Sequence, residues 1–246
     1  MRKLFLHVGF AKCGSTSLQE ALLGGRGIYF PKSGVNGAEH LSLPLYIRGV
    51  DDWTRQYFDE VWAESQHSAM LHEISDVPGD VFISSERLAA MSEEEIKRLL
   101  GIFSDFQIEI VIVERRIEKY LGSTWRHAVF YHDYAVDYED FLAKMNDFSF
   151  GRTEELFSKY FPVHVFDMDD EAYPKNLGHL IGTTIDMPRS NVGVPMSFAK
   201  LLQELHKLMG SKDFKALFTP QRKARMLEVV HGKRGVDIEP ILAPLF

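Results

Sequence analysis

Residues 7–19 read HVGFAKCGSTSLQ, and they combine features that suit the binding of an anion. Residues 3–9 alternate apolar and mixed side chains and end in glycine, so we expect a buried strand that runs into a loop. A helix is expected over residues 17–23, and its free backbone N–H groups and positive dipole end would face the loop. Lys12 adds a full positive charge, and the neighbouring hydroxyl groups add hydrogen-bond donors. The stretch therefore predicts a cradle for a phosphate or sulfate group.

The position of the lysine separates this loop from the loops of ATP- and GTP-binding proteins. Those loops read G-x-x-x-x-G-K-[ST], with the lysine after the second glycine. Here Lys12 precedes Gly14, and the residues that follow the expected strand 108–113, ERR, are mainly basic and offer no convincing metal ligand. A magnesium-dependent triphosphatase is therefore disfavoured. Taken alone, the loop is also compatible with an ordinary glycine-containing turn that carries an exposed lysine.

Strands and helices alternate along the chain. Apolar runs predict further strands at residues 28–30, 80–85, 108–113 and 161–166. Helices are expected at residues 51–72, 93–100, 117–132, 138–146, 152–160, 196–209 and 220–231. This order predicts a single α/β domain over residues 1–246, built in three layers with a central parallel sheet, helices on both faces and a helical C-terminal extension.

Composition and charge narrow the class of protein. The chain has 246 residues, of which 45% are hydrophobic, so a sizeable core can be buried. The formal net charge of -7 argues against general nucleic-acid binding. Cys13 is the single cysteine, which excludes an intramolecular disulfide. The apolar runs are too short for a signal peptide or for a membrane span of roughly 20 residues, so we expect a cytoplasmic protein.

A second group of residues is suited to a second phosphate. Arg115 follows the expected strand 108–113, and Ser123 comes eight residues later, about two turns along the next expected helix. An arginine offers a charged fork and a serine offers a hydroxyl, so the pair can hold one phosphate together. By itself the arginine is also compatible with a solvated basic position at a strand end.

Together these residues resemble sulfotransferases that use 3′-phosphoadenosine 5′-phosphosulfate. KCGSTSLQ at residues 12–19 resembles the 5′-phosphosulfate loop of that family, and Arg115 and Ser123 resemble its 3′-phosphate pair, with the same separation. YFPKSG at residues 29–34 and FISSERL at residues 82–88 also look like segments of bacterial members. The resemblance covers residues 4 to 130 in the right order and is weak beyond them.

The resemblance implies a P-loop NTPase-like sulfotransferase fold and a nucleotide cofactor without a metal. The product of this donor is 3′,5′-adenosine bisphosphate. The implied cofactor-binding residues are Lys12, Cys13, Gly14, Ser15, Thr16, Ser17, Arg115 and Ser123. Two positions depart from the family. Cys13 stands where serine or threonine is frequent, and Ser17 stands where some animal members carry an aromatic residue that stacks on adenine.

Sulfuryl transfer needs a positive charge that neutralises the leaving phosphate and a base that accepts the proton of the acceptor. We assign Lys12 to the charge. Glu86, directly after the strand 80–85, is the first choice for the base, because ligands bind at the carboxyl edge of such sheets. A capping or ion-pairing role is the alternative for Glu86. His40 is the second candidate base, although a lone loop histidine is more often a surface residue.

The sequence thus predicts an enzyme that moves a sulfuryl group to a hydroxyl or amine, with a small molecule or a carbohydrate or glycolipid as acceptor. A P-loop kinase for a small metabolite and a non-catalytic nucleotide-binding module are the alternatives. No metal site is expected, because His127 and His132 are five residues apart and no H-E-x-x-H pattern or cysteine pair exists. The identity of the acceptor and the oligomeric state stay open.

Overall fold

The first part of the fold is a parallel sheet whose strands follow the predicted order. The computed structural model describes residues 1–23, 27–52, 54–187 and 194–230. Within these residues a four-stranded sheet has the order β2-β1-β3-β4, and every pairing is parallel. The strands are β1 (Arg2–Val8), β2 (Val81–Ser85), β3 (Phe106–Glu114) and β4 (Val163–Asp167).

Helices connect and flank the strands. The α-helices are α1 (Ser15–Leu23), α2 (Ser42–Arg48), α3 (Glu60–Ser75), α4 (Glu93–Ile102), α5 (Ile117–His132), α6 (Tyr138–Lys144), α7 (Gly151–Ser158), α8 (Tyr173–Ile181), α9 (Met196–Leu217) and α10 (Pro220–Val230). The 3-10 helices are η1 (Thr54–Gln56) and η2 (Glu86–Ala90). The predicted three-layer α/β class is confirmed.

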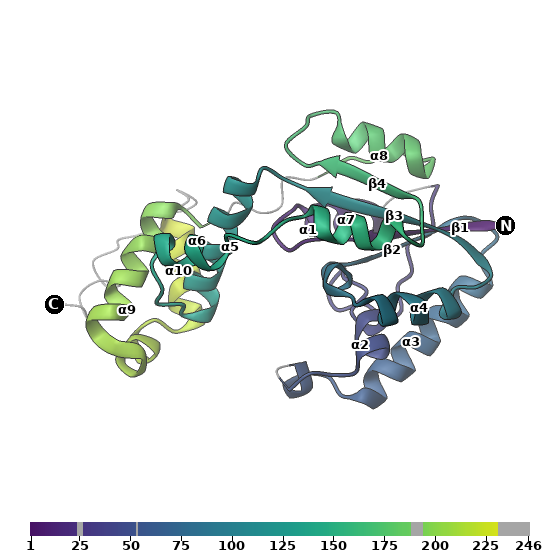
Figure 1. Ribbon diagram of the computed structural model, residues 1–246. Helices are drawn as coiled ribbons and strands as arrows, with labels where there is room; N and C mark the ends of the chain where they lie inside the picture. Colours follow the sequence, from purple (N-terminus) through teal and green to yellow (C-terminus); the bar gives the residue numbers. More distant parts are fainter. Residues whose placement is uncertain (24–26, 53, 188–193, 231–246) are drawn as a thin grey trace. The chain divides into compact units, whose positions relative to one another are not determined.

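The described residues fall into two compact units, and each is considered by itself. The first unit comprises residues 1–116 and 149–190, and the second comprises residues 117–148 and 191–246. The first unit contains the sheet with β1 to β4, and the second contains α5, α6, α9 and α10. In Figure 1 the first unit has α8 on one side of the sheet and α2, α3 and α4 on the other.

The centre of the first unit is β1, which is paired on both sides. Leu6 lies opposite Ile83 of β2 and Ile110 of β3, and all three side chains are fully buried. Continuous burial of this kind is expected for a parallel sheet that helices cover on both faces. On one face, apolar side chains of the sheet pack against α1 and α8, through residues that include Phe5, Phe82, Val111, Leu18 and Leu177.

The second unit has an apolar core of its own. Trp125 of α5 is buried, and its Nε1 donates to the carbonyl of Val136 at 2.9 Å. Phe198 and Leu202 of α9 belong to the same buried cluster. A buried indole with its N–H satisfied is the arrangement that aromatic residues adopt in stable cores. Helices α5, α6, α9 and α10 thus form a unit packed around shared apolar side chains.

Several predicted elements differ from the observed ones. Residues 28–30 do not form a strand, because only Tyr29 pairs with Val81, and Pro31 then removes a backbone donor. The helix expected over residues 51–72 begins later, at α3, where the Asp59 side chain caps the helix by accepting from Trp62 N at 2.7 Å. Residues 53 and 231 of the predicted helices lie outside the described residues.

Two helices were missed and one is longer than expected. Helix α2 contains a proline and is only seven residues long, so its periodicity is weak. Helix α8 starts with a proline near its first turn and ends at Gly182, which adopts a left-handed conformation, and both are ordinary boundary signals. Helix α9 continues to Leu217 through a kink at Gly210, whose φ of 75° is not helical.

Candidate functional site

The site residues of the first unit gather at the carboxyl edge of the sheet. Val8 at the end of β1 lies opposite Ser85 at the end of β2, so the residues that follow these strands, Gly9 and Glu86, leave the sheet side by side. Neighbouring β3 ends at Glu114 and delivers Arg115 to the same edge. Parallel strand order therefore brings three separate segments of the sequence to one place.

The loop between β1 and α1 has the backbone of an anion-binding turn. Lys12 and Gly14 have positive φ angles of 69° and 79°, and the N–H of Cys13 donates to the carbonyl of Phe10 at 3.2 Å. Helix α1 begins directly after Gly14, so the N–H groups of its first turn have no acceptor within the helix. Alternating left-handed and ordinary residues turn successive N–H groups toward one point, which suits an anion.

Two glycines allow the chain to pack closely around this loop. A Cβ atom at Gly14 would lie 3.2 Å from Cε of Met168, in addition to the cost of the positive φ angle. A Cβ atom at Gly9 would lie 2.6 Å from Cε1 of His7, which is buried beneath it. Both close approaches depend on the missing side chain of the glycine.

Glu86 is bound to the loop by a hydrogen bond. The Ser15 hydroxyl at the start of α1 donates to Oε1 of Glu86 at the start of η2. Burial raises the pKa of Glu86, the charge of Glu39 raises it further, and the Ser15 hydrogen bond and Lys12 oppose these effects. Burial also lowers the pKa of Lys12, against the opposing charge of Glu86. The Glu86 carboxylate and the Lys12 ammonium group are thus close enough to shift each other's pKa.

Arg115 is connected to the same loop. Its Nη1 donates to the carbonyl oxygen of Lys12 at 2.9 Å. Among the described residues its Nε is buried without a hydrogen-bond partner, which leaves a charged donor available to an anion. The next residue behaves differently, because Arg116 is exposed and forms an ion pair with Asp169 at 3.4 Å. Of the two arginines, the structure turns Arg115 toward the loop.

Cys13 is a buried part of the loop. Its side chain is 1% exposed. Burial raises the pKa of its thiol to about 12, although the charge of Arg115 acts in the opposite direction. A thiol that stays protonated is a poor nucleophile. Cys13 is therefore best described as a small apolar residue that fills the loop.

His40 is placed as a structural residue. Its side chain is fully buried, and burial lowers its pKa to about 4. Its Nδ1 accepts from the backbone N–H of Ser84 at 3.1 Å, and its Nε2 lies 3.0 Å from the carbonyl oxygen of Pro31. Both ring nitrogens are thus engaged by the backbone, and the ring joins the loop after Pro31 to β2.

Sequence reasoning overlooked a buried polar network below the loop. The Ser84 hydroxyl of β2 accepts from Nε2 of Gln19 at 2.9 Å and lies 2.8 Å from Nδ1 of His7. The sequence also gave no sign of Glu39. Its Oε1 accepts from the Ser85 hydroxyl at 2.6 Å and from the backbone N–H of Glu86 at 3.0 Å. Glu39 directly precedes the candidate base His40, and no local pattern distinguishes it from a surface carboxylate.

The remaining predicted site residues are placed as follows. Thr16 is exposed and Ser17 is half-buried in the first turn of α1. Ser123 is half-buried on α5. Ser123 belongs to the second unit and Arg115 to the first, so their pairing on one phosphate stays a prediction.

The described residues contain neither a candidate metal cluster nor a candidate membrane span. Within residues 1–23, 27–52, 54–187 and 194–230, no three or more histidine, cysteine, aspartate or glutamate side chains are grouped to hold a metal ion. The helices of this same part of the chain include none with the length and apolar character needed to cross a membrane.

Comparison with known proteins supports the fold. The chain is similar to the crystal structure of a sulfotransferase from Alicyclobacillus acidocaldarius, with a TM-score of 0.55 and 17% sequence identity over 94% of this chain and 96% of that chain. A structure from the PezAT chromosomal toxin-antitoxin system of Streptococcus pneumoniae matches at a TM-score of 0.38 and 14% identity, over 92% of this chain and 86% of that one. No protein-family model and no curated protein matches the chain.

Proposed function

We propose that this chain is a sulfotransferase that moves a sulfuryl group from 3′-phosphoadenosine 5′-phosphosulfate to a hydroxyl or amine of an acceptor. The observation that carries the proposal is the meeting of Lys12, Glu86 and Arg115 at one edge of the sheet, around a loop with the backbone of an anion site. The similarity to a sulfotransferase structure supports the fold on which this site depends.

The residues of the loop suit the 5′-phosphosulfate of the donor. The backbone N–H groups after Gly14 and the hydroxyls of Ser15, Thr16 and Ser17 would hold its oxygens. Lys12 would neutralise the charge that grows on the leaving 5′-phosphate, because its ammonium group is half-buried near the loop. The unpaired Nε of Arg115 would bind the 3′-phosphate, and we keep Ser123 as its proposed partner.

Glu86 is the base that this scheme requires. The acceptor hydroxyl gives its proton to Glu86, its oxygen forms a bond to sulfur, and the bond between sulfur and the 5′-phosphate oxygen breaks. Burial raises the pKa of Glu86, which makes the carboxylate a stronger base than an exposed one. We prefer Glu86 to His40, because both ring nitrogens of His40 are engaged by the backbone and its side chain is fully buried.

The acceptor is proposed from the resemblance alone. We propose a carbohydrate or glycolipid hydroxyl, and we place the reaction in the cytoplasm. Donor binding can be measured without an acceptor, so the cofactor site can be tested independently of this choice.

Competition binding tests the cofactor site. The protein should bind 3′,5′-adenosine bisphosphate more tightly than ATP, with or without magnesium, by calorimetry. Lys12→Ala and Arg115→Ala should each weaken bisphosphate binding roughly 10- to 100-fold, as expected for the loss of a charged hydrogen bond. A preference for ATP with magnesium would instead support a small-metabolite kinase.

Matched variants show whether such losses are specific. Arg116→Ala removes an exposed arginine next to Arg115, and Lys97→Ala removes an exposed lysine of α4 that is paired with Glu93. Both should leave bisphosphate affinity within about twofold. If Lys12→Ala and Arg115→Ala bind the bisphosphate as well as these controls do, the site assignment is wrong.

Transfer of labelled sulfate tests the reaction itself. Donor labelled on the sulfuryl group should pass label to a member of a carbohydrate and glycolipid panel, and Glu86→Gln should lower kcat about 100-fold or more while bisphosphate binding persists. Binding without transfer to any hydroxyl or amine acceptor would favour a non-catalytic nucleotide-binding module.

A further inference from the structure

Glu39 lies immediately beside the residue that the proposed function uses as a base. It comes from the loop between residues 31 and 41, whereas Glu86 comes from the end of β2. We propose that Glu39 is a positioning residue for Glu86, because it holds the backbone that carries Glu86 and places a second carboxylate next to it. This inference rests on the proposed function for its role in catalysis.

The backbone contact is direct. Oε1 of Glu39 accepts from the backbone N–H of Glu86 at 3.0 Å and from the hydroxyl of Ser85 at 2.6 Å. The Ser85 oxygen in turn accepts from the N–H of Arg87 at 3.4 Å, so it caps η2. A single carboxylate oxygen thus engages the N–H of Glu86 and the capping hydroxyl of the preceding residue. Free N–H groups at a helix start are the donors that such a carboxylate satisfies.

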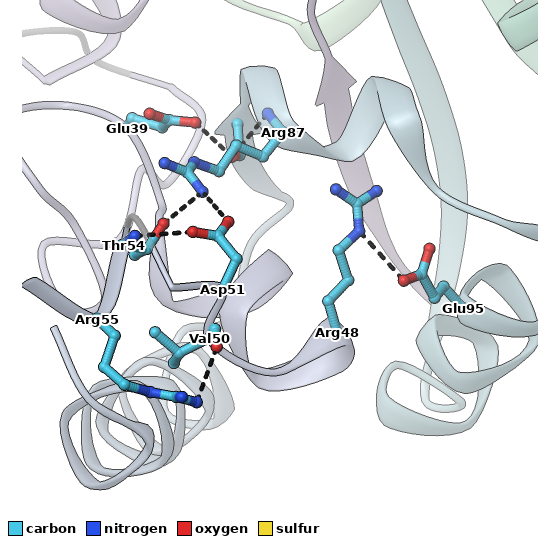
Figure 2. A network of polar contacts seen from close by, with 9 residues as sticks. Glu39, Arg48, Val50, Asp51, Thr54, Arg55, Arg87 and Glu95 are labelled. Atoms are coloured by element: carbon cyan, nitrogen blue, oxygen red, sulfur yellow. Dashed lines mark hydrogen bonds and ion pairs between the residues drawn. The ribbon is translucent and has the colours of Figure 1, made fainter.

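The far side of η2 is held by a second set of contacts. Nη1 of Arg87 donates to the hydroxyl of Thr54 at 3.0 Å and lies 3.5 Å from a carboxylate oxygen of Asp51, as Figure 2 shows. Figure 2 also includes Glu39 in this network of polar contacts. The first turn of η2 is therefore fixed from two directions, and the Glu86 side chain has a defined origin from which it reaches Ser15.

The charge of Glu39 has a separate effect from its hydrogen bonds. Burial raises the pKa of Glu86, and the neighbouring Glu39 carboxylate raises it further because two negative charges repel each other. The groups that oppose this are the Ser15 hydroxyl and the Lys12 ammonium group. One carboxylate, one hydroxyl and one ammonium group therefore act on the proton affinity of Glu86, from Glu39, Ser15 and Lys12 respectively.

The consequence for the proposed reaction is a more effective base. A base of higher pKa accepts a proton more readily in the transition state, provided that it is still ionised at the working pH. Glu39 supplies this increase without touching the acceptor, and its hydrogen bonds keep the geometry that the Ser15 contact needs. A purely structural capping residue would supply only the second of these effects.

Carbon-13 NMR of the glutamate carboxyl groups separates the two roles without using activity. Glu39→Gln retains an amide oxygen that can accept from Glu86 N–H and Ser85 but removes the charge. The carboxyl signal of Glu86 is the one that is lost in Glu86→Gln. Its titration midpoint should move to lower pH in Glu39→Gln. Glu73→Gln is the matched control, because Glu73 also accepts backbone N–H groups, those of Lys32 and Ser33, and should leave the Glu86 midpoint unchanged.

An unchanged Glu86 midpoint in folded Glu39→Gln protein would overturn the proposal. If that variant does not fold, Glu39→Asp tests the same point, because its shorter side chain keeps a carboxylate but moves the charge away from Glu86. A Glu86 midpoint that does not fall in folded Glu39→Asp protein would contradict the coupling.

Activity then tests the catalytic role. The acidic limb of the kcat/KM profile should move to lower pH in Glu39→Gln with little change in bisphosphate affinity, whereas Glu39→Ala should also lower kcat about tenfold by releasing η2. Failure of donor binding and of sulfate transfer in the wild type would refute the proposed function while leaving the NMR coupling measurable. A lower Glu86 midpoint with an unmoved activity limb would refute the positioning role alone.

Discussion

Ser15 joins the loop between β1 and α1 to the end of β2 through one hydroxyl group. Its hydrogen bond to Glu86 lowers the pKa of a carboxyl group that burial raises. The residue therefore has two functions that a sequence pattern does not separate. It is a loop hydroxyl suited to an anion, and it is also a donor that keeps Glu86 ionised. Removal of the hydroxyl should affect both.

Replacement of Ser15 by alanine should move the acidic limb of the kcat/KM profile to higher pH. The lost hydrogen bond opposed the effect of burial, so the pKa of Glu86 should rise and the ionised form should appear only at higher pH. Ser15→Thr retains a hydroxyl and is the matched control, which should keep the wild-type profile. A limb that stays in place or moves to lower pH in Ser15→Ala would contradict the assignment of Glu86 as the base.

The thiol of Cys13 should react slowly in the native protein. Burial raises its pKa to about 12, so the thiol is protonated at pH 8, and its side chain is 1% exposed. A chromogenic disulfide reagent should label the native protein at least 100-fold more slowly than the urea-unfolded chain, as a rough expectation for a buried thiol. Because the chain has one cysteine, the signal needs no correction. A native rate close to the unfolded rate would show that the loop is open.

Among the helices and loops, α3 has a role that its sequence does not reveal. Glu73 near its end accepts from the Tyr29 hydroxyl at 2.6 Å and from the backbone N–H groups of Lys32 and Ser33 at 2.8 Å each. Burial alone would raise the pKa of Glu73, but these hydrogen bonds outweigh it and lower the pKa to about 2. The helix thus holds the segment after Tyr29 in place of the strand pairing that the sequence predicted.

Protein stability should therefore depend on Glu73 in acid. The pKa is lowered on folding, so the carboxylate contributes stability that is present above its ordinary value of 4.5 and is lost as the pH falls toward 2. Urea unfolding at pH 6 and pH 3 should show a smaller acid loss in Glu73→Gln than in the wild type. Glu64→Gln, an exposed position on the same helix, serves as the control and should keep the wild-type loss. Equal losses in all three proteins would contradict this account.

At the scale of the whole molecule, the free energy of unfolding of the first unit should depend on the side chains at the centre of the sheet. Leu6 is fully buried and lies between Ile83 and Ile110 of the two neighbouring strands. Leu6→Ala should lower the free energy of unfolding of the first unit by about 2–5 kcal/mol, because it leaves a cavity between packed layers. Leu208→Ala, at a side chain that is 82% exposed, should change stability by less than about 0.5 kcal/mol. Urea unfolding followed by circular dichroism gives both values, and similar midpoints for the two variants would place Leu6 outside the core.

The parallel sheet could be predicted because its signals are local. The apolar runs at residues 80–85 and 108–113 became β2 and β3, and the capping box at Ser92 and Glu95 starts α4 as expected. The strand predicted at residues 28–30 was wrong, because Tyr29 forms only an isolated bridge, with Val81 at the start of β2. Pairing is a property of two segments, and a run of β-prone residues specifies only one of them.

The candidate site also has a part that the local sequence determines and a part that depends on distant segments of the chain. The features that suit the loop between β1 and α1 to an anion all lie within residues 7–19, where short-range sterics and the start of α1 specify the turn. The amino-acid order alone therefore predicts an anion cradle. The partners of Glu86 depend on long-range packing. Glu39 is 47 residues away along the chain and Ser15 is 71 residues away. Parallel pairing of β1 with β2 brings Ser15 to Glu86, and the hydrogen bonds between His40 and Ser84 bring the loop that carries Glu39. Burial at that edge then raises the pKa of Glu86, because the cost of removing a carboxylate from water depends on the folded surroundings and not on its neighbours in sequence.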